Sequence, residues 1–209
     1  MEKERVMTIL DLLEAEYGEA ECTLDYVNPL HLMIATQLAA QCTDARVNMV
    51  TPALFSRYNT AEDFMNADRE VLEGLIKSTG FFRNKSKNII ACCTMLVEEF
   101  NSEVPKTMEE LLKLPGVGRK TANLVLGDAF GIPGVVVDTH AGRLARRIGF
   151  TTENDPAKVE RDLIEIIPED KWIILGHWFV EHGRAVCNSI KPKCDSCTLA
   201  PFCEYYKAI

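Results

Sequence analysis

The stretch that decides the fold reads LPGVGRKTAN at residues 114–123 and is followed downstream by GVVVDTH at residues 134–140. Pro115-Gly116 is a turn signal, and Gly118 adds a second flexible position directly before an apolar helical run. Backbone N–H groups and the positive end of the helix dipole are therefore expected to be exposed at this helix start. Because glycine has no side chain, a phosphate group could approach the backbone closely.

Each of these features also has an ordinary explanation. A lone Gly-x-Gly is most often only a turn, and a lysine such as Lys120 in a first helical turn is most often solvated. Asp138, directly before Thr139-His140, would by default be an N-cap. The combined pattern is far more specific than its parts. It resembles the helix-hairpin-helix DNA glycosylases, and closely their endonuclease III branch, over nearly the whole chain.

The net charge of −8 argues at first against a nucleic-acid partner, but the bases are clustered along the chain. If the clusters share a face, the protein has a phosphate-binding side and an acidic back; the alternative is a set of ordinary solvated faces. The clusters are Lys77, Arg83, Lys85 and Lys87; Arg119 and Lys120; Arg143, Arg146 and Arg147; and Arg184, Lys191 and Lys193.

The sequence also bears on location and size. The first residues are charged and no long apolar core follows them, so no secretion signal is predicted, and no apolar run approaches the length of a membrane span. We therefore expect a cytoplasmic, nucleoid-associated protein without a membrane partner, in which the 8 cysteines do not form a disulfide framework. A chain of 209 residues can make one large domain or two small ones.

Helical spacing of apolar residues recurs along the chain and no stretch alternates convincingly as a strand, so the predicted fold class is all-α. Asn28-Pro29 is expected to open one helix, Thr43 or Asp44 to cap the next, and the segments 87–100, 141–148, 157–167 and 172–186 to be helical. The family resemblance implies two helical lobes with a DNA cleft between them. Residues 22–132 would form a six-helix barrel with the helix-hairpin-helix, and residues 1–21 would join residues 133–209 in an iron–sulfur cluster lobe.

Four cysteines near the end of the sequence have the spacing C-x6-C-x2-C-x5-C, which is a strong metal signal in an intracellular chain. They are Cys187, Cys194, Cys197 and Cys203. The spacing alone leaves tetrahedral zinc and a [4Fe–4S] cluster both open. The family resemblance implies the [4Fe–4S] cluster, with Lys191 in a basic loop between the first two ligands that contacts DNA phosphates.

Lysine chemistry suits base removal from DNA. An amine that attacks the sugar C1′ can end as a Schiff base, which makes β-elimination of the 3′ phosphate accessible. A free lysine has a pKa of about 10.4 and is mostly protonated near neutral pH, so a helix start and a neighbouring cation such as Arg119 would favour its reactive form. The resemblance implies Lys120 as nucleophile, Asp138 as its carboxylate partner and His140 in a supporting role.

An enzyme that acts on a base within a duplex must first take that base out of the stack. The segment Gly80–Lys85 has two adjacent aromatic residues beside basic ones, which suits a loop that wedges into stacked bases and holds phosphate. Phe82 is better explained as core. The resemblance implies Phe81 as an apolar wedge and Gln41 as the residue inserted into the duplex. It also implies DNA contacts from Gly116, Gly118, Arg119, His140 and Lys191.

The predicted function is a bifunctional DNA glycosylase and AP lyase of base excision repair. It would act as a monomer on double-stranded DNA containing damaged bases or abasic sites and remove oxidised pyrimidines. A non-catalytic helix-hairpin-helix module would leave Lys120, Asp138 and the cysteines unexplained, and a ferredoxin-like carrier would explain only the cysteines. A mismatch or adenine branch is a further alternative, but the adenine branch lacks the lysine and has glutamate where Thr36 stands here. Ala39 and Ala141-Gly142 depart from the family pattern and leave the exact lesion open.

Overall fold

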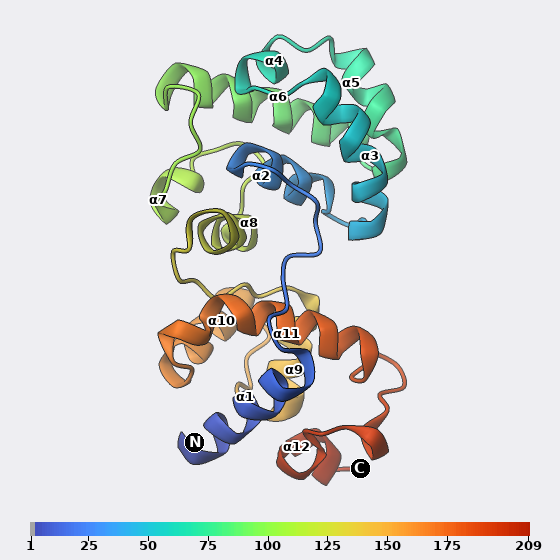
Figure 1. Cartoon of the computed structure of the whole chain (residues 1–209), viewed down its shortest axis with the longest axis vertical. Helices are drawn as coiled ribbons and strands as arrows, with labels where there is room; N and C mark the ends of the chain where they lie inside the picture. Colours follow the sequence, from blue (N-terminus) through green and yellow to red (C-terminus); the bar gives the residue numbers. More distant parts are fainter. Residues whose placement is uncertain (1–2) are drawn as a thin grey trace. The chain divides into compact units, whose positions relative to one another are not determined.

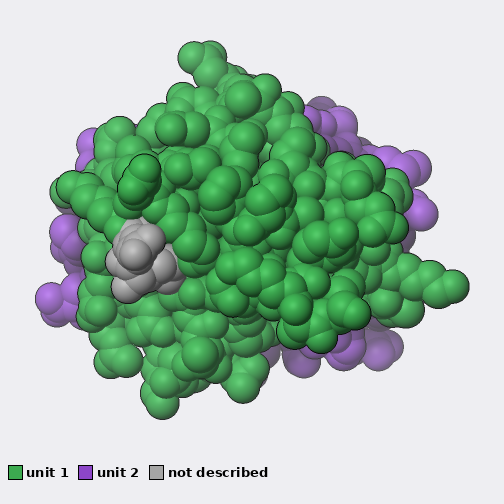
Figure 2. Space-filling model, turned by 90° about the horizontal axis from the view of Figure 1, so that it is seen from below, with its two compact units in different colours: residues 1–21, 133–209 green, residues 22–132 purple. Residues whose placement is uncertain are grey.

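The computed structural model describes residues 3–209, and within that range it contains helices and no β-strand (Figure 1). The predicted all-α fold class is confirmed. The chain forms two compact units, drawn in green and purple in Figure 2: unit 1 comprises residues 1–21 and 133–209, and unit 2 comprises residues 22–132. Across the described residues, no helix combines the length and apolar character needed to cross a lipid bilayer.

Unit 2 is a bundle of helices (Figure 1). Its elements are α2 (Pro29–Leu38), α3 (Asp44–Arg57), α4 (Ala61–Met65), α5 (Arg69–Ile76), the 3₁₀ turn η1 (Lys77–Thr79), α6 (Phe82–Glu99), α7 (Met108–Leu111), α8 (Arg119–Leu124) and the π-helical turn η2 (Val125–Ala129).

Helix α2 is the central element of unit 2. Pro29 occupies its first turn, and the Asn28 side chain caps it by accepting a hydrogen bond from the His31 backbone N–H at 2.8 Å, as the sequence predicts. Every residue from Leu30 to Leu38 is buried. A helix that is buried on all sides must lie inside a core, and α2 packs against α3, α6 and α8.

The caps of the neighbouring helices follow the sequence, with one exception. Thr43 caps α3, and Thr60 and Asp68 cap α4 and α5. Helix α6, however, begins at Phe82, whereas the apolar pattern predicted a start at Lys87. The residue before it, Phe81, has a left-handed backbone (φ +47°) and supplies no side-chain cap, so no capping signal marks the true start.

Unit 1 is assembled from both ends of the chain. Its elements are α1 (Lys3–Tyr17), α9 (Thr139–Ile148), α10 (Pro156–Ile166), the 3₁₀ turn η3 (Glu169–Lys171), α11 (Trp172–Ala185), the 3₁₀ turns η4 (Cys194–Ser196) and η5 (Ala200–Phe202), and α12 (Glu204–Lys207). Trp178 and Phe179 of α11 are fully buried in one core with Leu10 of α1 and Leu144 of α9. The Trp178 indole N–H also donates to the Gly18 carbonyl at 2.8 Å, which ties the end of α1 to α11.

Candidate active site and DNA interface

The sequence stretch LPGVG forms a tight turn between α7 and α8 in unit 2. Thr107 caps α7, and the Val117 N–H donates to the Leu114 carbonyl at 3.1 Å across the turn. Gly116 has φ +78°, and a Cβ there would lie 2.7 Å from Gln37 Oε1 and 2.9 Å from Asn88 Cβ. Backbone angle and space therefore both require glycine at position 116.

Gly118 has a different reason to be glycine. Its backbone is extended (φ −104°, ψ 177°), which any residue can adopt, and a Cβ there would meet nothing within 4 Å. It is the N-cap residue of α8, and no side chain caps that helix. The open space over Gly118 and the side-chain-free start of α8 leave room for an anion to reach the backbone.

Lys120 is exposed in the first turn of α8, next to the exposed Arg119. Three residues of unit 2 share its electrostatic surroundings. Burial, together with Asp128 and Asp44, raises the pKa of the Cys22 thiol to about 12, and Lys120 acts in the opposite direction. Lys120 and the two carboxylates therefore all lie within electrostatic range of one largely protonated thiol.

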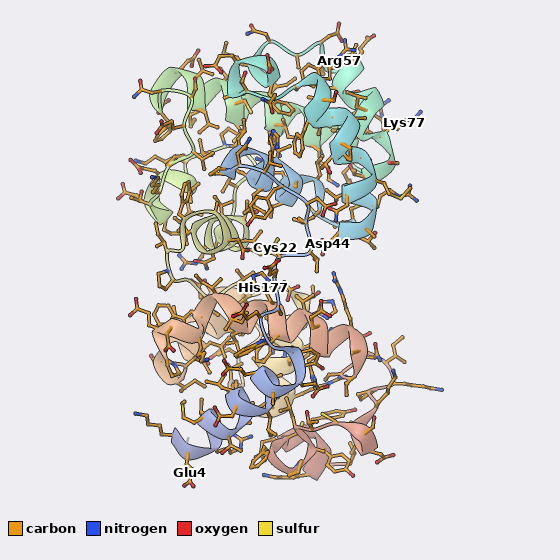
Figure 3. All side chains as sticks on the ribbon, viewed as in Figure 1. Glu4, Cys22, Asp44, Arg57, Lys77 and His177 are labelled. Carbon is orange, nitrogen blue, oxygen red and sulfur yellow. The ribbon has the colours of Figure 1, made fainter. Side chains whose placement is uncertain are left out.

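Two of these neighbours, Cys22 and Asp44, are labelled in Figure 3. The Thr23 hydroxyl donates to Asp44 Oδ2, and the Asn48 side chain donates to the Thr23 carbonyl at 2.8 Å, so the segment entering unit 2 is fixed on the first turns of α3. Sequence reasoning gave Cys22 no role and considered Asp44 only as a cap. No local pattern links these positions to residue 120, since only the fold places them near it.

Asp138 begins α9 in unit 1. Its Oδ1 accepts a hydrogen bond from the Ala141 N–H at 2.7 Å, so it is the N-cap, and its side chain is half-buried. His140 is held inside the same unit: its Nδ1 lies 3.1 Å from Arg143 Nη2, and a Cβ on Gly183 would come within 2.4 Å of that Nδ1. Gly183 therefore makes room on α11 for the His140 ring.

Gln41 and Phe81 occupy two loops of unit 2, between α2 and α3 and between η1 and α6. Both are exposed, Phe81 at 63%, and both have positive φ, +54° for Gln41 and +47° for Phe81. Such angles are uncommon for residues with large side chains and are retained where the surrounding structure enforces them. Phe82 packs partly buried against the core of unit 2.

The predicted basic loop around Phe81 needs a correction. Lys85 is only 6% exposed, and its ammonium donates to two backbone carbonyls, so it is not part of a phosphate-binding surface. The Arg147 guanidinium also donates hydrogen bonds within the protein, to the Asn188 and Ser189 carbonyls at 2.7 and 2.8 Å. Sequence clustering could not separate solvated bases from bases that hold loops together, because burial depends on the tertiary fold.

The four cysteines of the C-terminal segment line one pocket, together with Leu144 and Arg147 of α9 and His182 of α11. Short 3₁₀ turns carry the segment, and Arg147 holds it: Arg147 Nη1 lies 3.3 Å from Cys187 Sγ, and the Cys203 thiol donates to the Arg147 carbonyl. Lys191 is exposed on the loop between the first two cysteines. Among residues 3–209, no three His, Cys, Asp or Glu side chains converge on a single metal ion.

The electrostatics of this pocket favour a cationic occupant. Burial, together with the neighbouring cysteines Cys187, Cys203 and Cys194, raises the pKa of Cys197 to about 11. Four thiolates sharing one pocket therefore need a positively charged group to offset their repulsion. His182, which the sequence did not single out, is buried behind them, with Nδ1 2.8 Å from the Tyr17 hydroxyl and Nε2 3.4 Å from Cys197 Sγ.

This chain is helical, has a glycine hairpin before an exposed lysine and has a pocket lined by four cysteines. Together these features are typical of one class of helix-hairpin-helix protein. The family model for the HhH-GPD superfamily base excision DNA repair protein matches residues 34–169. The chain is 54% identical over 207 residues to endonuclease III of Synechocystis sp., covering 99% of this chain and 94% of the relative. It is 43% identical to endonuclease III of Bacillus subtilis, covering 93% and 90%.

Solved structures agree. A non-covalent endonuclease III–DNA complex and a trapped endonuclease III–DNA covalent intermediate each match with a TM-score of 0.95 at 43% identity, covering 100% of this chain and 98% of the other. The chain therefore belongs to the endonuclease III family of the HhH-GPD superfamily of base excision DNA repair proteins. The predicted family and the predicted enzyme class are confirmed.

Proposed function

We propose that this protein is a bifunctional DNA glycosylase and AP lyase that removes oxidised pyrimidines from double-stranded DNA and then cleaves the strand 3′ to the abasic site. The observation that carries the proposal is the exposed Lys120 in the first turn of α8, directly after the open backbone of Gly118. A DNA phosphate bound at the start of α8 would bring the Lys120 amine close to the sugar of the same strand.

The reaction follows from the chemistry of an amine. The Lys120 Nζ attacks C1′ of the damaged nucleotide, the bond from C1′ to the base breaks, and the base leaves with the bonding electrons and a proton. Opening of the sugar ring gives a Schiff base between C1′ and Nζ. Loss of a proton from C2′ then expels the 3′ phosphate by β-elimination, and water releases the sugar fragment from the lysine.

Asp138 is proposed to accept a proton during these steps and to stabilise positive charge that develops at the sugar. One of its oxygens caps α9, and this bond fixes the carboxylate while leaving it half-exposed. His140, held by Arg143, is proposed as a supporting contact to DNA.

DNA binding is proposed to use both side chains and backbone. Gly116 and Gly118 would offer hairpin N–H groups to phosphates, with Arg119 beside them and Lys191 on the cysteine-bordered loop. Gln41 and Phe81 would fill the space that the extruded nucleotide leaves. The exposure of both side chains at their loop tips supports this role. Acting on DNA, the protein would work in the cytoplasm at the nucleoid.

The four thiols of Cys187, Cys194, Cys197 and Cys203 are proposed to hold a [4Fe–4S] cluster. The pocket that the four thiols share and membership in the endonuclease III family support a [4Fe–4S] cluster over one zinc ion. When bound, the cluster would supply structural cross-linking of this segment, and no step of base removal passes through it. The bound cluster would fix the position of the loop that carries Lys191.

The test is excision from defined duplexes. Purified protein is incubated with matched duplexes that carry thymine glycol, an abasic site or no lesion. We expect release of the damaged base from the thymine glycol duplex only, strand cleavage with a β-elimination product on the thymine glycol and abasic duplexes, and no cleavage of the duplex without a lesion. Binding without base release or cleavage would leave a DNA-binding module and overturn the proposed enzyme.

A further inference from the structure

Two exposed residues with strained backbones, Gln41 and Phe81, are separated in sequence but are tied to one buried side chain. Lys85 is 6% exposed, and its Nζ donates to the Leu38 carbonyl at 2.7 Å and to the Thr79 carbonyl at 2.8 Å. Leu38 ends α2, shortly before Gln41, and Thr79 ends η1, shortly before Phe81. One ammonium group therefore fastens the start of both loops.

The two carbonyls explain why a lysine can be buried here. Carbonyls in the last turn of a helix lack intrahelical partners, and a cation at this end also interacts favourably with the helix dipole. Burial lowers the pKa of Lys85, with a nearby Cys42 acting in the opposite direction. Burying an unpaired ammonium would be strongly unfavourable, so the fold needs these two short hydrogen bonds to stabilise Lys85 in its buried position.

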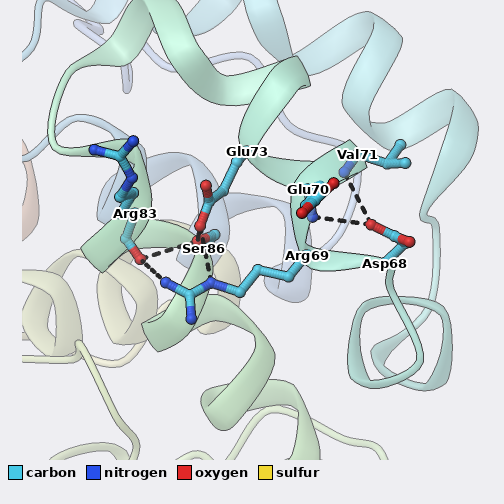
Figure 4. Close-up of polar contacts among 7 residues, drawn as sticks. All are labelled: Asp68, Arg69, Glu70, Val71, Glu73, Arg83 and Ser86. Atoms are coloured by element: carbon cyan, nitrogen blue, oxygen red, sulfur yellow. Dashed lines mark hydrogen bonds and ion pairs between the residues drawn. The ribbon is translucent and has the colours of Figure 1, made fainter.

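The other side of the Phe81 loop is fixed by a separate network, drawn in Figure 4. The Arg83 carbonyl accepts from Arg69 Nη2 at 3.3 Å and from the Ser86 hydroxyl at 3.0 Å, and Glu73 Oε1 accepts from both Arg69 Nε and Ser86. This network anchors the first turn of α6 to α5. The Lys85 backbone N–H also donates to the Phe81 carbonyl at 3.0 Å.

We propose that Lys85 is a positioning residue that joins the Gln41 and Phe81 loops into one rigid wedge for opening the DNA base stack. The proposal rests on the proposed function and assigns Lys85 no contact with DNA. A wedge that is preorganised does not have to be ordered during base extrusion. Lys85 should therefore matter for extruding a base and much less for binding undamaged duplex.

The test compares Lys85→Met, which keeps the apolar stem and removes the ammonium, with Lys158→Met, which removes an exposed ammonium from α10 in unit 1. Single-turnover excision of thymine glycol should fall about 10- to 100-fold in Lys85→Met, the scale of a misplaced reacting group. Excision by Lys158→Met should stay close to wild type. Affinity for undamaged duplex and its salt dependence should be the same in the two variants.

A readout that needs no catalysis accompanies this comparison. In a duplex with 2-aminopurine opposite a stable abasic-site analogue, wild-type binding should raise the fluorescence as the base unstacks, and Lys85→Met should lose most of that rise. Amide hydrogen exchange should also speed up in both loops, residues 39–42 and 80–82. If Lys85→Met does not fold, Lys85→Gln, which keeps a donor on a shorter side chain, takes its place.

The outcomes separate the two proposals. Fluorescence and excision equal to those of Lys158→Met would overturn the role of Lys85 while leaving the proposed function intact. Faster exchange in only one loop would also contradict it, because the two loops would not be joined. A wild-type protein that opens the duplex but excises nothing would contradict the enzyme activity, and the fluorescence comparison would still decide the role of Lys85. A wild-type protein that does neither would overturn both.

Discussion

Asp138 can serve α9 as a cap and the reaction as a carboxylate, and a single substitution separates the two roles. Asparagine caps a helix as well as aspartate does, so Asp138→Asn should keep the bond from the Ala141 N–H and fold normally. It cannot accept a proton or offset positive charge at the sugar. We expect base excision to fall by roughly a hundredfold or more, the scale of acid–base and electrostatic contributions.

The measurement is single-turnover base release, with thermal unfolding and DNA affinity as controls that should both remain near wild type. Normal excision by a well-folded Asp138→Asn protein would leave this residue as a cap only. The search for a proton acceptor would then move to His140, or to Asp44 and Asp128, which act on the same thiol, Cys22, as Lys120 does.

At the residue scale, the sequence predicted which side chains have a chemical role better than it predicted which residues surround them. Asp138 as N-cap was readable because capping depends on a few neighbouring positions. Lys85 was assigned to a solvated basic face, and this was wrong, because its partners Leu38 and Thr79 are brought to it only by the fold. The fold also brings Cys22 within electrostatic range of Lys120, and no local sequence pattern predicts this.

At the scale of the hairpin element, the two glycines should respond differently to substitution. Gly118→Val places a side chain in open space on an extended backbone, so the fold should tolerate it. The new side chain would stand where a phosphate must approach, and phosphate contacts carry no sequence information. We expect weaker binding to damaged and undamaged duplex alike, with little change in unfolding temperature.

Gly116→Ala is the matched comparison. Its Cβ would collide with Gln37 and Asn88 at a left-handed backbone position, so this variant should lose stability as well as binding. Binding isotherms and thermal melts of both variants make the comparison. Unchanged binding by Gly118→Val to both duplexes would remove the hairpin backbone from the DNA interface.

The cysteine segment is the second element that can be tested by itself. Purified protein should be brown and contain iron and acid-labile sulfide, and Cys197→Ser should lose both, since it removes a thiol lining the pocket. Cys22→Ser, outside that pocket, is the control and should keep the colour. A colourless, fully active protein containing one zinc ion would contradict the proposed cluster.

Some helix boundaries could be predicted from the sequence and others could not. Capped helices such as α2 and α3 began where Asn28 and Thr43 predicted. Helix α6 began earlier than predicted because Phe81 precedes it without a capping side chain. The π-helical turn after α8, Val125–Ala129, has no sequence signal that distinguishes it from a continuing α-helix.

At the scale of the whole molecule, unit 1 and unit 2 each have their own apolar core. The chain passes between them twice, so unit 1 combines α1 with the C-terminal helices. Lys120 belongs to unit 2, and Asp138 and the four cysteines belong to unit 1. The family and the all-α class could be predicted because the hairpin and cysteine motifs are local in sequence. The composition of unit 1 from both ends of the chain came only from the resemblance.

Lys120 is proposed to become covalently bound to the sugar during the reaction, and reductive trapping makes that bond visible. Borohydride added during reaction with a thymine glycol duplex should reduce the Schiff base and give a stable protein–DNA adduct, with mass spectrometry placing the adduct on Lys120. Lys120→Ala should form no adduct while still binding the duplex. Trapping of Lys120→Ala at the wild-type rate, or an adduct mapped to another residue, would contradict the account.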